Sequence, residues 1–282
     1  MARIAWIVLV LLAAGTSLLE RAGILAFSGL GTVQAVLVAL AVLAMLADAA
    51  ANFSEVRRFG RTIRMVIQKD LQIEWRTRAR LNGLVFFALA TLLMFSFALG
   101  PDTAILRRNA GGYLWLGILF ASVLSLGESF RIETENQCLD GLRLAPVDAR
   151  AIFLGKALGN TFMLWILAIV ITPVTIALYD VSVKEGVLKL FGVLLLGCFG
   201  ISAPGTIYGA IASNARARDV LLPLLLFPVL IPSLLASVKA TGLILEGDPM
   251  GQLGSWLGLL GAFNLLYWGL GFALFPRVIE DD

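Results

Sequence analysis

The sequence contains apolar runs that are long enough to cross a lipid bilayer as helices. A helical span needs roughly 17–25 residues to cross the hydrocarbon core, and runs of that length recur along the chain. Of the 282 residues, 59% are hydrophobic and 15% are charged, against roughly a quarter charged in an average soluble domain. Because a water-soluble core cannot hold this excess, we expect a polytopic membrane protein.

The composition of these runs predicts helices rather than strands. They are rich in Leu, Ala and Gly and lack the alternation of polar and apolar residues that a transmembrane β-barrel requires. Inside the bilayer an α-helix satisfies its own backbone hydrogen bonds, so we predict an all-α fold. Eight spans are expected, at about 4–19, 31–51, 83–100, 112–128, 157–178, 188–212, 220–238 and 254–275.

The first of these runs has two interpretations. Arg3 precedes the run and small residues follow Ala13, which is also the pattern of a secretory signal peptide. We favour a retained helical hairpin, because a second span follows at once.

The basic residues predict an orientation in the membrane. If both termini are cytoplasmic, 16 of the 22 Lys and Arg residues fall on the cytoplasmic side, as the positive-inside rule requires. The six on the other side are Arg21, Arg107, Arg108, Lys184, Lys189 and Lys239. The net charge of +3 therefore reflects topology, and no nucleic-acid partner is expected.

A charged segment at 56–82 separates an N-terminal hairpin, residues 1–55, from a six-span body, residues 83–282. Its apolar side chains recur at steps of four, at Ile63, Ile67, Leu71 and Trp75. This spacing predicts one apolar stripe on a helix that lies in the membrane interface. The helix is either a simple anchor or the elbow helix through which a transporter enters the membrane.

The longest cytoplasmic loop predicted for the body, at about 127–156, is mixed in charge. Apolar side chains stand between charges in segment 137–144, and Pro146 then ends any helix there. A short helix with apolar knobs suits docking into a groove on a cytoplasmic partner. An ordinary charged connection has the same composition, so both interpretations stay open at this point.

The sequence lacks several kinds of chemistry. It contains no histidine, so it offers no imidazole ligand for zinc or haem iron and no histidine acid–base catalyst. Cys138 and Cys198 are far apart in the sequence and indicate neither a disulfide framework nor a metal site. No nucleotide-binding Gly-x-x-x-x-Gly-Lys-Ser/Thr motif occurs. We therefore predict no catalytic residue, no metal and no bound cofactor, and any ATP must be used by a separate subunit.

Three segments carry a family pattern: the charged loop at 128–148, the segment 205–223 with the Leu- and Pro-rich run that follows, and the basic segment 69–80. Together they resemble the CcmB family, the haem-exporter permease subunit of cytochrome c maturation, and more distantly the type-2 ABC exporters. The resemblance covers about 66–275, and residues 1–55 have no counterpart in the six-span family pattern.

The resemblance implies partners and a location. Two copies of the chain are expected to sit on two CcmA-like ATP-binding subunits, together with haem-handling membrane proteins, in a bacterial inner membrane. The coupling helix to the ATPase is expected between the second and third family spans. The residues carried over are Glu133, Glu135, Leu139, Leu142, Arg143 and Pro146.

The expected function is ATP-driven haem export, or release of haem to its chaperone, in c-type cytochrome biogenesis. Closure of the ATPase dimer would move the coupling helix and the adjoining spans as rigid levers. Two alternatives stay open: a type-2 exporter of a lipid, polysaccharide or drug, and a membrane assembly scaffold without a transport cycle. Substrate-binding residues are not predicted.

The glycines of the 188–212 span form a separate pattern. Gly192, Gly197, Gly200, Gly205 and Gly209 occur at short intervals. Small residues allow neighbouring helices in a membrane to approach closely, so we expect this span to be tightly packed.

Overall fold

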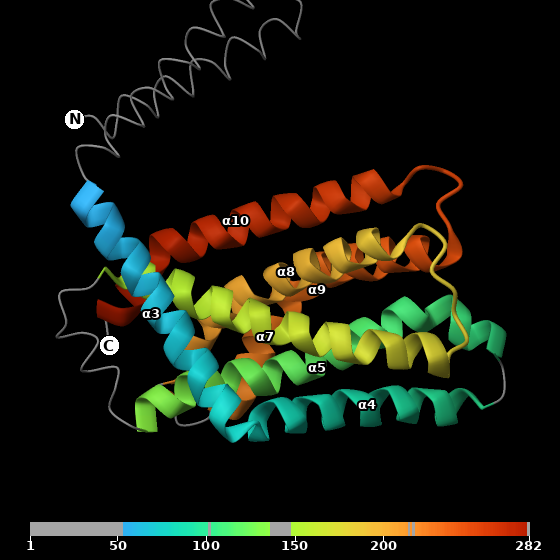
Figure 1. Ribbon diagram of the computed structural model, residues 1–282, viewed down its shortest axis with the longest axis horizontal. Coiled ribbons are helices and arrows are strands. Elements are labelled where there is room, and N and C mark those ends of the chain that lie inside the picture. Colours follow the sequence, from blue (N-terminus) through green and yellow to red (C-terminus); the bar gives the residue numbers. More distant parts are fainter. Residues whose placement is uncertain (1–52, 101–102, 136–147, 214, 216–217, 281–282) are drawn as a thin grey trace, which may run out of the picture. The chain divides into compact units, whose positions relative to one another are not determined.

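The structure is a computed structural model that describes residues 53–100, 103–135, 148–213, 215 and 218–280 (Figure 1). The regular elements in these ranges are α-helices. They are α3 (Phe53–Thr77), α4 (Ala79–Leu99), α5 (Thr103–Glu135), α7 (Ala149–Leu178), α8 (Val187–Ser213), α9 (Arg218–Glu246) and α10 (Leu253–Glu280).

Six of the described helices are long and apolar enough to cross a membrane. The spans are Arg80–Leu99, Thr103–Phe130, Ala149–Leu178, Val187–Ser213, Val220–Glu246 and Leu253–Val278. The all-α class and the six body spans are thus confirmed, and the chain is a multi-pass membrane protein. The predicted spans 4–19 and 31–51 lie outside the described residues.

Two helices begin well before their predicted starts. α5 starts at Thr103 rather than near residue 112, and α7 starts at Ala149 rather than near 157. Hydropathy marks only the apolar part of a helix, whereas backbone hydrogen bonding continues through its polar ends. At the start of α7 the Asp148 carboxylate accepts a hydrogen bond from the Arg150 N–H at 2.9 Å, so this helix has an N-terminal cap.

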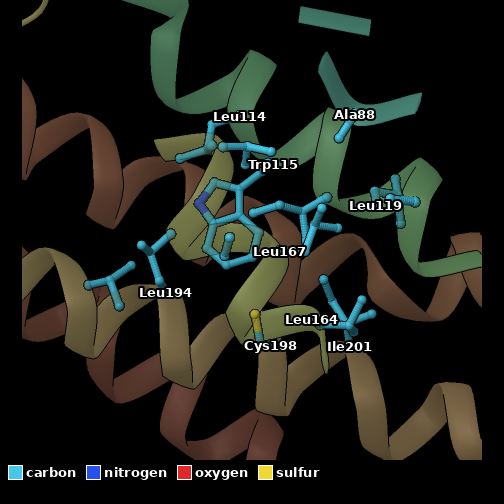
Figure 2. Packing of buried hydrophobic residues seen from close by; sticks show 14 of the residues in the cluster. Ala88, Leu114, Trp115, Leu119, Leu164, Leu167, Leu194, Cys198 and Ile201 are labelled. Atoms are coloured by element: carbon cyan, nitrogen blue, oxygen red, sulfur yellow. The ribbon is translucent and has the colours of Figure 1, made fainter. Parts of the chain in front are cut away.

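The helices from Thr62 onward form one compact unit, in which α4, α5 and α7–α10 run side by side (Figure 1). α8 contacts α5, α7, α9 and α10, and α5 and α7 also each contact four helices, so these three helices form the centre of the bundle. Figure 2 shows the core at this point: Trp115 of α5 lies among Leu114, Leu167, Leu194 and other buried side chains. The Trp115 Nε1–H donates to Thr241 Oγ1 of α9 at 2.9 Å, so a buried polar group of α5 finds its partner on another span.

The glycines of α8 explain how its neighbours approach so closely. A Cβ at Gly197 would overlap the ring of Trp115, and a Cβ at Gly205 would overlap Leu126. The predicted close packing is confirmed at these two positions. At Gly192, in contrast, an added Cβ would have no neighbouring helix atom within 4 Å.

Candidate functional site

The residues of the predicted elbow stripe lie on α3. Ile63, Ile67 and Leu71 are partly buried, whereas the Trp75 side chain is 75% exposed. The guanidinium of Arg78 lies over the Trp75 ring, 5.4 Å from its centroid, in a cation–π contact. An exposed Trp beside an Arg is typical of the headgroup level of a membrane.

A second face of α3 packs on the six-span bundle and carries Val66, Asp70 and Glu74. A Cβ built at Gly155 of α7 would come within 2.7 Å of the Val66 Cβ, so only a glycine allows α3 to lie this close to α7. Val66 and Glu74 are each less than a tenth exposed. Two of the acidic residues that the sequence places beside the apolar stripe are therefore contacts between α3 and the bundle.

Lys156 joins three helices at this end of the bundle. Its Nζ lies 3.2 Å from Asp70 Oδ2 on α3 and donates to the Ser129 carbonyl of α5 at 3.0 Å. The Nζ also lies 5.4 Å from the centroid of the Phe130 ring. Only 2% of the Lys156 side chain is exposed. A buried ammonium is costly unless it is paired and hydrogen-bonded, and here both conditions are met.

The break between α3 and α4 depends on Glu74 and Arg78. Arg78 has a φ of 49°, in the left-handed region, and offers no side-chain cap to α4. Glu74 supplies the missing cap, because its Oε1 accepts a hydrogen bond from the Leu81 N–H at 2.7 Å. A carboxylate at a helix N-terminus also interacts favourably with the helix dipole. The elbow is thus a helix–helix corner whose cap comes from the preceding helix.

Arg80 ties this corner to α5. Its Nη2 donates to the carbonyl and the hydroxyl of Ser125, at 2.7 and 2.6 Å. The carboxylates of Glu74, Asp70 and Glu128 act on its guanidinium electrostatically. The corner, α5 and α7 are therefore connected through one network of charged and polar side chains.

Deeper in the bundle, polar contacts continue along the same face of α7. Asn160, one helical turn beyond Lys156, donates to Thr206 Oγ1 of α8 at 3.1 Å. Thr161 and Ser202 share a hydrogen bond between their hydroxyls. Buried polar groups in a bilayer need such internal partners, so α7 is linked by hydrogen bonds both to α8 and, through Lys156, to α3 and α5.

The predicted coupling residues are described only in part. Glu133 and Glu135 lie in the last turns of α5, and the other four, Leu139, Leu142, Arg143 and Pro146, lie outside the described residues. The helices on either side of this loop, α5 and α7, are the two that contact each other through Lys156 and Ser129. Any movement of the loop would therefore act on helices that the Lys156 network holds together.

Sequence reasoning missed the role of Lys156, which it counted only as one basic residue of a cytoplasmic loop. A signal was present, because Lys156 is the only charge in the otherwise apolar and small-residue stretch 151–159. A lone charge in such a stretch predicts a buried and paired side chain. Its partner Asp70 could not be found in this way, since no periodicity relates two positions so far apart.

The sequence profile of the CcmB protein family matches residues 61–275. This region contains all six described spans except the last residues of the sixth. The chain belongs to the CcmB family. The first 60 residues lie outside the match.

Individual relatives of the CcmB family agree with the profile. The chain is 32% identical over 208 residues to "Heme exporter protein B" of Bradyrhizobium diazoefficiens, covering 73% of this chain and 91% of the relative. It is 32% identical over 190 residues to the protein of that name from Rhodobacter capsulatus, covering 65% and 86%. The Escherichia coli K12 protein of that name is 26% identical over 204 residues, covering 70% and 88%.

Proposed function

We propose that this chain is the membrane-spanning permease subunit of an ATP-driven transporter that exports haem, or releases it to a chaperone, during c-type cytochrome biogenesis. The observation that carries the proposal is the match to the CcmB family over 61–275, which includes the α3–α4 corner and nearly the whole six-span bundle. The relatives' name, "Heme exporter protein B", supports haem as the cargo.

The location and orientation are part of the proposal. The chain would lie in a bacterial inner membrane with both termini in the cytoplasm, because this orientation puts 16 of the 22 basic residues on the cytoplasmic side. The loop between α5 and α7 and the Lys156 network are then also cytoplasmic. That is the side on which ATP is available.

The partners follow from what the chain lacks. It has no nucleotide-binding motif, so ATP would be hydrolysed by a separate CcmA-like subunit that contacts the loop between α5 and α7. A second copy of this chain and the haem-handling proteins of cytochrome c maturation would complete the complex. The absence of histidine supports a subunit that transmits movement and does not ligate haem iron through imidazole.

The mechanical step uses α5 and α7 as levers. Closure of the ATPase would move the loop between them, and both helices would move as rigid bodies. Lys156 bonds to Ser129 of α5 and pairs with Asp70 of α3, so the elbow helix would move with them. The network thus turns a movement of one loop into a concerted movement of three helices.

The ATPase contact is tested by substitution in the loop. We expect Leu139→Asp and Leu142→Asp each to lower the amount of ATPase subunit that co-purifies with the tagged chain by about tenfold, the equivalent of about 1.4 kcal/mol of lost contact energy. An apolar knob that enters a groove cannot be replaced by a carboxylate without desolvation cost. The measurement is quantitative mass spectrometry of the complex purified in mild detergent.

A matched control lies at the opposite end of the bundle. Leu188, near the start of α8, is 86% exposed, and Leu188→Asp should leave the co-purified ATPase unchanged. The proposed coupling contact is wrong if both loop variants retain the ATPase at the wild-type level. The transporter proposal itself fails if no ATP-binding subunit accompanies even the wild-type chain.

A further inference from the structure

A cavity of about 650 Å³ lies beside the α3–α4 corner. Its polar wall carries Lys69, Asp70, Glu74, Arg80, Glu128 and Lys156. Its apolar wall includes Phe86 and Phe87 of α4 and Leu124 of α5. The cavity is therefore amphipathic, with charges at the α3 side and rings and aliphatic groups along two spans.

The apolar wall faces the bilayer. Phe86 is 76% exposed, Phe87 40% and Leu124 51%, and all three lie within candidate membrane spans. Large apolar side chains that are exposed on a span contact lipid tails. In a bilayer the cavity would therefore border on the acyl chains of neighbouring lipids, and its charged wall would lie at the headgroup level that α3 and Trp75 indicate.

The polar wall offers donors for an anionic group. The Lys69 side chain is 42% exposed, and its Nζ lies 3.4 Å from Asp70 Oδ1. Arg80 uses Nη2 for Ser125, while its buried Nε–H has no hydrogen-bond acceptor among the described residues. Buried donors without an acceptor are rare and indicate a missing group. Lys69 and Arg80 line the same wall of the cavity as the carboxylates of Asp70, Glu74 and Glu128, and Lys and Arg are the side chains that bind phosphate.

We propose that this cavity binds a phospholipid molecule, with its phosphate against Lys69 and Arg80 and its acyl chains along Phe86, Phe87 and Leu124. The headgroup would lie between α3 and the bundle, so the lipid would help hold the elbow helix in place. This inference does not depend on which compound the transporter exports, because lipid binding is measured on the resting protein.

Gly83 provides the variant that tests the cavity. It lines the cavity, and a Cβ at this position would have no neighbouring atom within 4 Å, so a side chain can be added at Gly83 without a clash at its Cβ, and Gly83→Phe adds a large ring there. Gly258 of α10 has the same open surroundings and does not line the cavity, so Gly258→Phe is the matched control. Native mass spectrometry of the full chain in detergent, titrated with palmitoyl-oleoyl phosphatidylethanolamine, gives the binding constants.

We expect Gly83→Phe to weaken phosphatidylethanolamine binding by about tenfold or more and Gly258→Phe to change it by less than about twofold. A diacylglycerol with the same chains, which lacks the phosphate, should bind the wild-type chain about tenfold more weakly than phosphatidylethanolamine. Lys69→Gln, a change at a half-exposed side chain, should weaken binding of the phospholipid and leave that of diacylglycerol unchanged.

Three results would overturn the proposal. One is equal binding of diacylglycerol and phosphatidylethanolamine, and another is an equal loss in the Gly83→Phe and Gly258→Phe variants. The third is Lys69→Gln protein that binds phosphatidylethanolamine as the wild type does, and this result decides the matter if Gly83→Phe fails to fold.

Discussion

Lys156 carries its charge in a buried position, where the loss of hydration of an ammonium group costs free energy. With 2% of its side chain exposed, it has lost nearly all of its hydration, and Asp70, the Ser129 carbonyl and the Phe130 ring are among the groups that contact it instead. Replacing such a pair by apolar residues is often neutral, whereas removing one partner leaves a buried charge without compensation. We therefore interpret the pair as a determinant of how α3, α5 and α7 pack against one another.

Lys156→Met tests this interpretation. We expect it to lower the free energy of unfolding by about 3 kcal/mol, because Asp70 and Ser129 lose their partner. The measurement is unfolding in mixed detergent micelles. The double variant Asp70→Asn/Lys156→Met should lose less than the sum of the two single variants, since the isolated charge is then gone.

Lys189 is the matched control for Lys156. It also pairs with a carboxylate, Glu185, at 2.8 Å, but its side chain is 54% exposed. Lys189→Met should change the free energy of unfolding by no more than about 0.5 kcal/mol, as is usual for exposed pairs. Equal effects of the two Lys→Met changes, or strictly additive losses in the double variant, would contradict the account of Lys156.

At the scale of elements, two carboxylates hold the connection before α10. Asp248 accepts hydrogen bonds from the backbone N–H groups of Gln252 and Leu253, each at 2.8 Å. Glu185, just before α8, accepts from the Asp248 N–H at 3.4 Å and from Lys189 Nζ at 2.8 Å. The pKa of Asp248 is held below its ordinary value, mainly by the Leu253 N–H, and that of Glu185 mainly by the hydrogen bond from Lys189.

These shifts predict how stability depends on pH. A carboxylate with a lowered pKa in the folded state stabilises the fold above its unfolded pKa of about 4, and this contribution is lost as the pH falls further. Asp248→Asn keeps a capping side chain but cannot titrate. We expect its melting temperature to fall less steeply than that of the wild type between about pH 5 and pH 3.

Thermal unfolding, followed by circular dichroism at several pH values, measures how the melting temperature depends on pH. Asp148→Asn, which alters another exposed helix cap, serves as the comparison. If the melting temperatures of Asp248→Asn and the wild type fall in parallel down to the lowest pH, the Asp248 carboxylate does not contribute to stability as described.

The sequence predicted the six spans because each span is an unbroken apolar run, a property of neighbouring residues. The boundary between the elbow helix and the first body span was predicted at 82/83, whereas the break lies at Arg78. It was misplaced because no Gly or Pro occurs at Arg78 and the cap comes from Glu74 of the preceding helix. The Lys156–Asp70 pair was not predicted. It joins positions that only the packing of α3 on α7, through Gly155, brings together.

For the whole molecule, the family match and the network give complementary information. The match over 61–275 identifies the CcmB family, and the network shows that buried polar contacts link α3, α5 and α7. Both helices that flank the predicted coupling loop take part in it. Under the proposed function, a movement of this loop would therefore reach α3 as well as α5 and α7.

The most direct test of the central claim is the covalently bound haem of c-type cytochromes in a strain of the host that lacks this chain. Haem staining of separated membrane proteins should show that c-type cytochromes are lost, while spectra of the b-type cytochromes remain normal, and the wild-type gene should restore the c-type signal. Normal assembly of c-type cytochromes in the deletion strain would contradict the proposed function.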